Sequence, residues 1–361
     1  WLSRNRPEAN VVYINKELQE FRDIVTAEHL YDYVIERLPE GGENYLLIDE
    51  VQDIENYENA LRSFHAANRC QVIATGSNAY IFSSELGTRL SGRYIEIKIY
   101  NLSYLEFLRF HGLEDSDEAL MHYLRMGGLP GLCVFKPEEK SQINDYFEGV
   151  YNTILVKDIV SREKVRNVAQ LENIIRFVAD NIGKPLSIAN IVRYMISKGE
   201  KISAETVSCY LKYLNDAFLA IPVRRFDIHG KVLLESNNKH YFSDHGIRNY
   251  LCGADIRGSI EKIMENVVWN HLRRQGFEVT VGLLRAGEID FVATKADKRI
   301  YVQVTYLLAS EETVQREFGN LAAIKDNYPK FVVSMDPMDG GFSEYPGIRH
   351  VRLRDFLKMD Q

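Results

Sequence analysis

The most informative segment of the sequence is YLLIDEVQ at residues 45–52, in which four apolar residues run directly into two adjacent carboxylates. A short apolar run without polar alternation is typical of a strand that is buried on both faces of a parallel sheet. Acids at the end of such a strand suit phosphate chemistry, with Asp49 organising magnesium and Glu50 polarising an attacking water. A core strand that merely ends in acids is the alternative.

Three further apolar runs lie at residues 11–14, 72–74 and 94–97, and helix-length segments separate them. Buried strands that alternate with helices are typical of β-α-β units, in which the strands pair in parallel. We therefore expect residues 1–101 to form an α/β domain with a parallel sheet built from these runs.

Small polar residues, TGSN at 75–78, follow the run at 72–74. If this run neighbours the acidic strand, Ser77 or Asn78 lies near the acids and could orient water beside a γ-phosphate. Arg89 and Arg93 come four residues apart before the next run. Either could act as an arginine finger, because a guanidinium stabilises charge on a transferred phosphoryl group, or could form a surface ion pair.

The composition is that of an ordinary folded protein, with 361 residues, 45% hydrophobic and 26% charged. This length implies two or three domains, and the net charge of −7 excludes a uniformly basic coat for nucleic acid. No apolar run approaches the roughly 18 residues of a membrane span, so we expect no membrane partner. Four cysteines without a CxxC pair favour buried thiols and a cytoplasmic location.

Three regions follow the predicted sheet. Residues 102–160 are expected to form a helical appendage, which GGLPG at 127–131 interrupts because its glycines and proline do not fit a regular helix. Residues 161–235 show three amphipathic helices and then two apolar runs around a His-Gly turn, which is the order of a winged helix-turn-helix. Residues 236–361 mix helical and strand patterns and predict a small α/β domain.

The predicted winged helix differs in charge from the whole chain, because residues 161–235 hold 12 Lys and Arg against 8 Asp and Glu. Cations on the two turn helices and at the hairpin could contact the phosphates of double-stranded DNA. These are Arg193, Lys198, Lys201, Lys212, Arg224, Arg225 and Lys231. The same excess of positive charge would also be found on a surface that docks a protein partner, or on a plain solvated surface.

Together and in this order, the segments resemble a widespread bacterial and archaeal group of AAA-superfamily ATPases over nearly the whole chain. The matching motifs are DE at 49–50, TGSN at 75–78, LSGRY at 90–94, LSYLEF at 102–107, GGLPG at 127–131, YFSDHG at 241–246 and GEIDF at 287–291. The resemblance implies a P-loop ATPase core at 1–101, a helical appendage at 102–160, a winged helix at 161–235 and a restriction-endonuclease-like domain at 236–361. It also implies ATP and magnesium as cofactors, with Asp49 holding magnesium through water, and it is compatible with a homo-oligomer.

One departure from the family concerns the phosphate-binding loop. The pattern GxxxxGK[ST], whose backbone N–H groups and Lys cradle phosphates, occurs nowhere in these residues. In the family this loop precedes the strand that matches residues 11–15, and the chain begins at Trp1 with neither Met nor an apolar leader. We therefore expect the loop upstream of Trp1 in a longer chain; a naturally degenerate ATPase is the alternative.

The last domain raises the question of nuclease chemistry. In restriction-like enzymes an Asp and a second acid hold magnesium, and a Lys two residues after the second acid assists the attacking water. Asp290 matches the first acid, whereas Gln303 and Thr305 stand where the second acid and the Lys are expected. An amide and a hydroxyl replace these groups poorly, although Glu265 could add an acid. We therefore expect a degenerate nuclease fold rather than an active nuclease.

The sequence thus predicts an ATP-dependent molecular switch that is coupled to a winged helix and a nuclease-like domain. The first alternative is a DNA- or protein-binding module with a vestigial nucleotide site. The second alternative is a metal-dependent nuclease, for which Asp290 would be essential.

Overall fold

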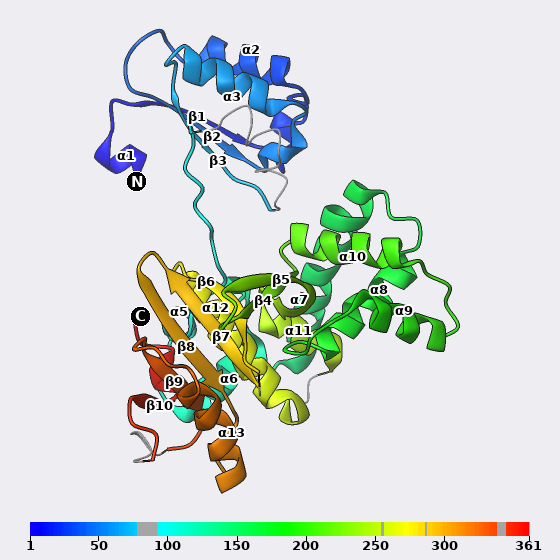
Figure 1. The fold of residues 1–361 in the computed structure, drawn as a ribbon. Coiled ribbons are helices and arrows are strands. Elements are labelled where there is room, and N and C mark those ends of the chain that lie inside the picture. Colours follow the sequence, from blue (N-terminus) through cyan, green and yellow to red (C-terminus); the bar gives the residue numbers. More distant parts are fainter. Residues whose placement is uncertain (78–91, 137, 254–255, 286, 338–343, 361) are drawn as a thin grey trace. The chain divides into compact units, whose positions relative to one another are not determined.

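The computed structural model describes residues 1–77, 92–136, 138–253, 256–285, 287–337 and 344–360. The chain divides into two compact units, Trp1–Lys98 and Ile99–Gln361, and each is described by itself (Figure 1). Among the helices that the structure describes, none combines the length and the apolar character needed to cross a membrane.

The smaller unit is a parallel sheet with helices, as the alternation of apolar runs predicts. Its strands are β1 (Asn10–Asn15), β2 (Asn44–Asp49) and β3 (Gln71–Ala74), in the order β1-β2-β3. Its helices are α1 (Leu2–Asn5), α2 (Ala27–Arg37) and α3 (Tyr57–Ala66), with 3₁₀ turns η1 (Gln19–Phe21) and η2 (Val51–Asp53). Both strand pairs are parallel, with Ile48 opposite Ile14 on one side and Ala74 on the other, so the predicted sheet is confirmed for these three strands.

The core of the smaller unit lies between the sheet and its two longer helices. Ile14 and Ile48 on the strands are buried in one cluster with Leu30 and Val34 of α2 and Phe64 of α3. Each such side chain stabilises the unit by about 1.5–3 kcal/mol when it is removed from water. This packing holds the carboxyl ends of β2 and β3 beside each other.

The prediction of a fourth strand at residues 94–97 is wrong. These residues enter none of the strand ladders that the structure describes, and the side chains of Ile95 and Ile97 are 89% and 78% exposed. A segment becomes a strand only where a neighbour pairs with its backbone N–H and carbonyl groups. Apolar alternation alone does not supply that neighbour.

The larger unit is built on a seven-stranded mixed sheet in the order β10-β9-β8-β7-β6-β4-β5. Its strands are β4 (Ala220–Asp227), β5 (Val232–Phe242), β6 (Glu278–Leu283), β7 (Glu288–Lys295), β8 (Lys298–Val304), β9 (Lys330–Ser334) and β10 (Ile348–Arg352). β4 and β5 form the predicted antiparallel hairpin. β4 also pairs in parallel with β6, with Arg225 opposite Val281, so the hairpin belongs to this sheet. The predicted domain limit between residues 235 and 236 therefore falls inside β5.

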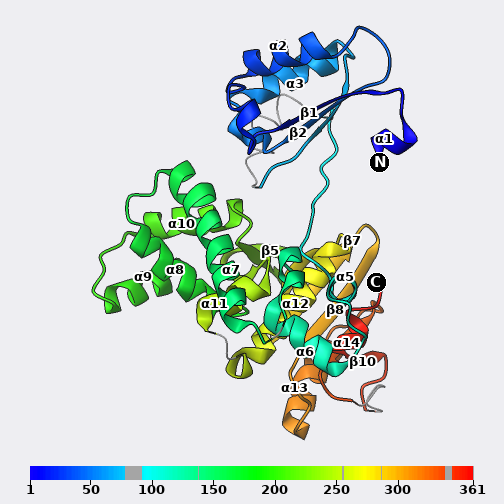
Figure 2. The same cartoon turned by 180° about the vertical axis from the view of Figure 1, so that it is seen from behind.

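Helices surround this sheet and gather beside the hairpin (Figures 1 and 2). Those before the hairpin are α5 (Tyr104–His111), α6 (Asp117–Met126), the 3₁₀ turn η4 (Pro130–Val134), α7 (Lys140–Thr153), the π-helix η5 (Ile154–Ser161), α8 (Val168–Asp180), α9 (Ile188–Ser197) and α10 (Ala204–Asp216). Those after it are α11 (His245–Cys252), the 3₁₀ turn η6 (Arg257–Ser259), α12 (Ile260–Arg274), α13 (Glu311–Ala322) and α14 (Leu353–Phe356). The hydroxyls of Ser187 and Ser203 cap α9 and α10 by accepting backbone N–H groups three residues on.

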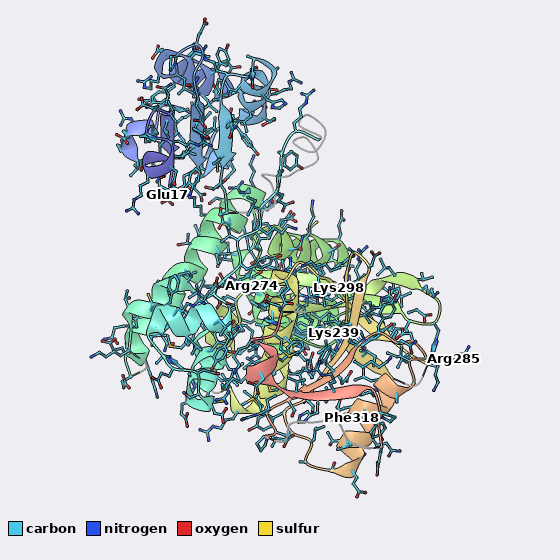
Figure 3. All side chains as sticks on the ribbon, turned by 90° about the vertical axis from the view of Figure 1, so that its left-hand side faces the viewer. Glu17, Lys239, Arg274, Arg285, Lys298 and Phe318 are labelled. Atoms are coloured by element: carbon cyan, nitrogen blue, oxygen red, sulfur yellow. The ribbon has the colours of Figure 1, made fainter. Side chains whose placement is uncertain are left out.

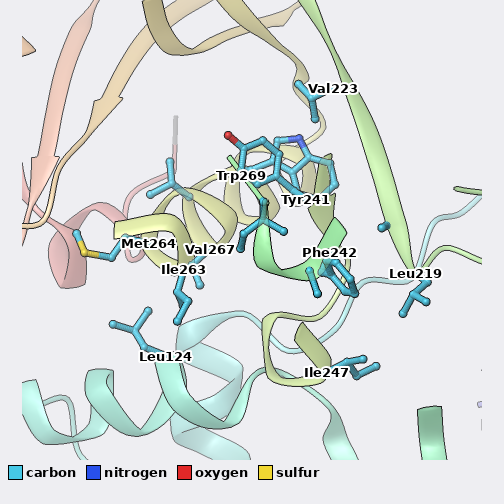
Figure 4. Close-up of a cluster of buried hydrophobic side chains, with 14 of the residues drawn as sticks. Leu124, Leu219, Val223, Tyr241, Phe242, Ile247, Ile263, Met264, Val267 and Trp269 are labelled. Atoms are coloured by element: carbon cyan, nitrogen blue, oxygen red, sulfur yellow. The ribbon is translucent and has the colours of Figure 1, made fainter. Parts of the chain in front are cut away.

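Helices α12 and α13 pack on opposite faces of the sheet. In β8, Val302 and Val304 belong to the hydrophobic cluster of α12, whereas Tyr301 belongs to the cluster of α13. Figure 4 shows the first cluster, in which Trp269 of α12 stacks on Tyr241 of β5 with ring centroids 5.4 Å apart. Alternation along each strand thus directs successive side chains toward different helices.

Candidate functional site

The first candidate site lies in the smaller unit, where β2 and β3 end beside each other. The backbone N–H of Thr75 donates to the carbonyl of Ile48 over 2.8 Å, and the Thr75 hydroxyl donates to a carboxylate oxygen of Asp49. The hydroxyl oxygen of Ser77 lies 3.5 Å from Oε2 of Glu50. The structure thus brings together the predicted Asp49, Glu50 and Ser77. It adds Thr75, which the sequence analysis did not single out as a site residue.

Glu50 has a left-handed backbone conformation, with φ 57° and ψ 52°. A residue with a side chain adopts this conformation at a cost of about 1–2 kcal/mol. Nε2 of Gln52 donates to Oε2 of Glu50 and lies 3.5 Å from the hydroxyl oxygen of Ser77. Gln52 therefore links the acid to the polar end of β3. The sequence analysis missed this link, although a polar side chain two residues after the acid pair was a visible signal.

Lys16 directly follows β1 at the same edge of the sheet, and its backbone N–H donates to the carbonyl of Asp49 over 3.2 Å. Its ammonium donates to the carbonyls of Phe21 and Ile24 over 2.5 and 2.7 Å. Burial lowers the pKa of Lys16. Because two carbonyls already hold the ammonium, Lys16 orders the chain after β1 and is not a free phosphate ligand.

The other predicted residues of this site are not brought to it by the described structure. Arg93 is exposed. Asn78 and Arg89 lie outside the described residues. Their roles, like the magnesium role of Asp49, stay predictions.

The second candidate site lies in the larger unit around Lys239 on β5. The sequence analysis did not identify Lys239 as a site residue. The side chain of Lys239 is 3% exposed and lies inside this unit (Figure 3). Its Nζ lies 2.6 Å from Oε1 of Glu288, 3.5 Å from Oδ1 of Asp290 and 3.8 Å from Oε2 of Glu265. These acids come from β7 and α12. One ammonium therefore connects two strands and a helix, and we call this group the lysine-carboxylate cluster.

Asp290 and Gln303 lie side by side on neighbouring strands within this cluster. Oδ2 of Asp290 accepts the backbone N–H of Val304 over 2.9 Å. Oε1 of Gln303 accepts the backbone N–H of Asp290 over 3.2 Å. The amide oxygen that would replace a carboxylate ligand is thus turned toward the backbone.

Glu265 and Thr305 are also bound by protein groups. The Tyr241 hydroxyl donates to Oε2 of Glu265 over 2.9 Å. The Thr305 hydroxyl donates to Oε1 of Glu261, one turn before Glu265 on α12, over 3.2 Å. The structure therefore gathers Glu265, Asp290 and Gln303 and places Thr305 beside the same helix.

Burial dominates the electrostatics of the lysine-carboxylate cluster. It raises the pKa of Glu265 to about 8, and the neighbouring Asp290 adds to this rise. It also raises the pKa of Asp290 to about 6, although Lys239 opposes the shift. Burial by itself lowers the pKa of Lys239, but attraction by Glu265, Asp290 and Glu288 raises that pKa above its ordinary value. The ammonium is therefore charged at neutral pH.

The cations predicted to contact DNA are mostly exposed, which leaves them free of the core. The exposed ones are Arg193, Lys198, Lys201, Lys212, Arg224 and Lys231, whereas Arg225 is half-buried. Arg193 lies on α9 and Lys212 on α10, and Lys198 and Lys201 lie between these helices. Arg224 has an ion pair to Glu278 at 3.5 Å. This arrangement does not test contact with DNA, so the DNA-binding role of these residues stays a prediction.

Two motifs of the sequence, GGLPG and YFSDHG, meet in the larger unit around Asp244. Its Oδ2 accepts the backbone N–H of Gly128 over 2.8 Å and the side-chain amide of Asn101 over 3.2 Å. Its Oδ1 accepts the backbone N–H of Ile247 over 3.0 Å and caps α11. A Cβ on Gly246 would lie 2.2 Å from the carbonyl oxygen of Met126. These motifs therefore form a close-packed structural joint.

Comparison with known proteins identifies relatives over most of the chain. A model of the AAA domain matches residues 2–108, and a model of a domain of unknown function matches residues 117–257. An uncharacterized protein of Haemophilus influenzae is 35% identical over 96% of this chain and 86% of its own length. An uncharacterized protein of Methanocaldococcus jannaschii is 27% identical over 87% of this chain and 73% of its own length. A solved Walker-type ATPase of Pyrococcus abyssi is similar with a TM-score of 0.45 and 14% identity, over 68% of this chain and 85% of that one.

Proposed function

The chain belongs to the family of AAA-domain proteins that includes its Haemophilus influenzae relative, and we propose that it hydrolyses ATP with magnesium to drive a conformational switch. The observation that carries this proposal is the meeting of Asp49, Glu50 and Ser77 where two parallel strands end. An acid pair with a neighbouring hydroxyl at such an edge suits the positioning of a metal and a water beside a phosphoryl group.

Each residue of this edge has a distinct role in the proposed reaction. Asp49 would hold magnesium, and the Thr75 hydroxyl, which donates to its carboxylate, would fix the orientation of that carboxylate. Glu50 would polarise the attacking water, and Ser77, whose hydroxyl oxygen lies 3.5 Å from the Glu50 carboxylate, would sense the γ-phosphate. Bound magnesium would neutralise part of the negative charge of the phosphates.

The test of this proposal is ATP turnover by the polypeptide as its gene encodes it, including any residues upstream of Trp1. We expect turnover to require magnesium. Glu50→Gln should lower it by about 10²-fold or more, because a positioned base typically contributes that much. The matched control is Glu36→Gln, since Glu36 is an exposed acid on α2 of the same unit. Unchanged turnover in Glu50→Gln would remove Glu50 from the mechanism.

The coupled module of the proposal is the larger unit. Helices α8, α9 and α10 precede a hairpin in the order of a winged helix, which supports the predicted winged helix-turn-helix. Strands and helices after the hairpin support a mixed α/β domain of the restriction-endonuclease-like kind. ATP turnover would change how this module engages its partner.

A second candidate function is a DNA-binding module whose nucleotide site is vestigial. The exposed cations on and between α9 and α10 favour it. Binding of a short DNA duplex should then weaken steeply with salt, whatever nucleotide is present. Lys198→Ala with Lys201→Ala should reduce both the affinity and the salt slope, whereas the exposed Lys140→Ala on α7 should change neither. Binding of a protein partner, without DNA affinity, is the remaining form of this alternative.

A further inference from the structure

The nuclease-like fold that residues 236–361 resemble implies a magnesium ion among its acids, and the residues present do not fit one. Within the part of the chain that the structure describes, no three His, Cys, Asp or Glu side chains are arranged to hold a metal ion. Three acids do converge, from β7 and α12, but the ammonium of Lys239 stands between them.

The oxygens that a divalent ion would use are already bound by protein donors. Asp290 accepts Val304 N–H with one oxygen and faces the Lys239 ammonium with the other. The amide oxygen of Gln303 accepts a backbone N–H. Oε2 of Glu265 accepts the Tyr241 hydroxyl. A hard cation fills about six ligand positions partly with water, but here it would have to share these oxygens with bound donors and displace the Lys239 ammonium.

We propose that Lys239 supplies the positive charge that a metal ion supplies in active enzymes of this fold, so that the lysine-carboxylate cluster is a permanent, metal-free joint without nuclease activity. The ammonium is a compact charge with three donors, and three carboxylates lie within 3.8 Å of it. It contacts β7 and α12 from β5 and thereby ties the hairpin to both. This inference concerns the larger unit and does not depend on ATP hydrolysis.

Removal of the lysine charge should expose the latent metal preference of the acids. In Lys239→Met the acids lose their shared cation, and a buried carboxylate without a counter-ion destabilises a fold strongly. A divalent ion can then enter in its place. The double variant Lys239→Met with Asp290→Asn loses one of these acids and should gain no such site.

The experiment compares native protein, Lys239→Met, the double variant and Asp290→Asn by thermal unfolding and by manganese binding, with manganese or with a chelator. We expect Lys239→Met to unfold at a lower temperature in chelator and to recover with manganese. It should bind manganese at least about tenfold more tightly than the native protein and the double variant. Native protein and Asp290→Asn should respond to manganese equally.

Three results would overturn the proposal. The first is manganese binding by the native protein that Asp290→Asn abolishes, and this comparison holds even if Lys239→Met does not fold. The second is a destabilised Lys239→Met that manganese does not restore. The third is metal-dependent DNA cleavage by the native protein that both Asp290→Asn and Lys239→Met eliminate, which would make Lys239 a nuclease lysine.

Discussion

Replacement of Asp244 by alanine removes a buried carboxylate that accepts three hydrogen bonds. Loss of the α11 cap to Ile247 costs about 1 kcal/mol. The N–H of Gly128 and the amide of Asn101 lose a charged acceptor, and a buried donor without a partner costs about 1–3 kcal/mol. Because Asn101 keeps some access to solvent, we expect the free energy of unfolding of the larger unit to fall by about 3–5 kcal/mol.

The assay is a denaturant titration followed by tryptophan fluorescence. Of the two tryptophans, Trp269 is buried in the core of the larger unit and Trp1 is exposed, so the change in emission reports mainly on the larger unit. The matched control is Asp145→Ala, because Asp145 is an exposed acid on α7. It should change stability by less than about 0.5 kcal/mol. A fall below about 1 kcal/mol for Asp244→Ala would refute the claim that this carboxylate holds the joint.

Two further predictions follow from the cluster and from the strand ends. Burial raises the pKa of Glu265 to about 8, so its contribution to stability is complete below the ordinary pKa of 4.5 and declines as pH rises toward 8. Denaturant titrations across this range should show the decline in the native protein and a flatter profile in Glu265→Gln; identical profiles would contradict the shift. Thr75→Val should lower ATP turnover by about 10- to 100-fold, because Asp49 loses a hydrogen bond worth about 1.5–3 kcal/mol. Turnover equal to that of the native protein would show that the hydroxyl does not orient this acid.

The parallel sheet of the smaller unit was predictable because its signals are local. The run at 45–48 is apolar on both faces and ends in acids, and the run at 72–74 ends in small polar residues. Parallel strands that lie side by side end at one edge, so the pairing of β3 with β2 brings Ser77 to Glu50. Gln52 was harder to predict, since its role depends on the turn that begins at Glu50.

The segment at 94–97 shows the limit of local patterns. Ile95 and Ile97 alternate as strand residues do, yet they are exposed. A strand is defined by its neighbour, and the sequence of the segment carries no record of that neighbour. The same limit explains the hairpin, because the turn predicted its two strands but not that β4 would pair with β6.

Lys239 shows why half of the second site was missed. Asp290 and Gln303 were found through a motif and strand alternation, both of which act over a few residues. The ion pairs of Lys239 reach across 26 residues to Glu265 and 49 residues to Glu288, and only the folded sheet brings these groups together. Lys239 lies between Asn238 and His240, so its immediate neighbours give no local sign that it is buried.

The hairpin connects the helices of the larger unit directly to its sheet. The chain passes from α10 to β4 through only the residues 217–219, and β4 is hydrogen-bonded to β5 and β6. β4 pairs with β6 only at Arg225–Asp227, and β5 is the edge strand of the sheet, so the hairpin is an extension of the seven-stranded sheet rather than a separate wing. A ligand that contacts α10 would therefore be separated by only three residues from a strand of the sheet on which α12 and α13 pack.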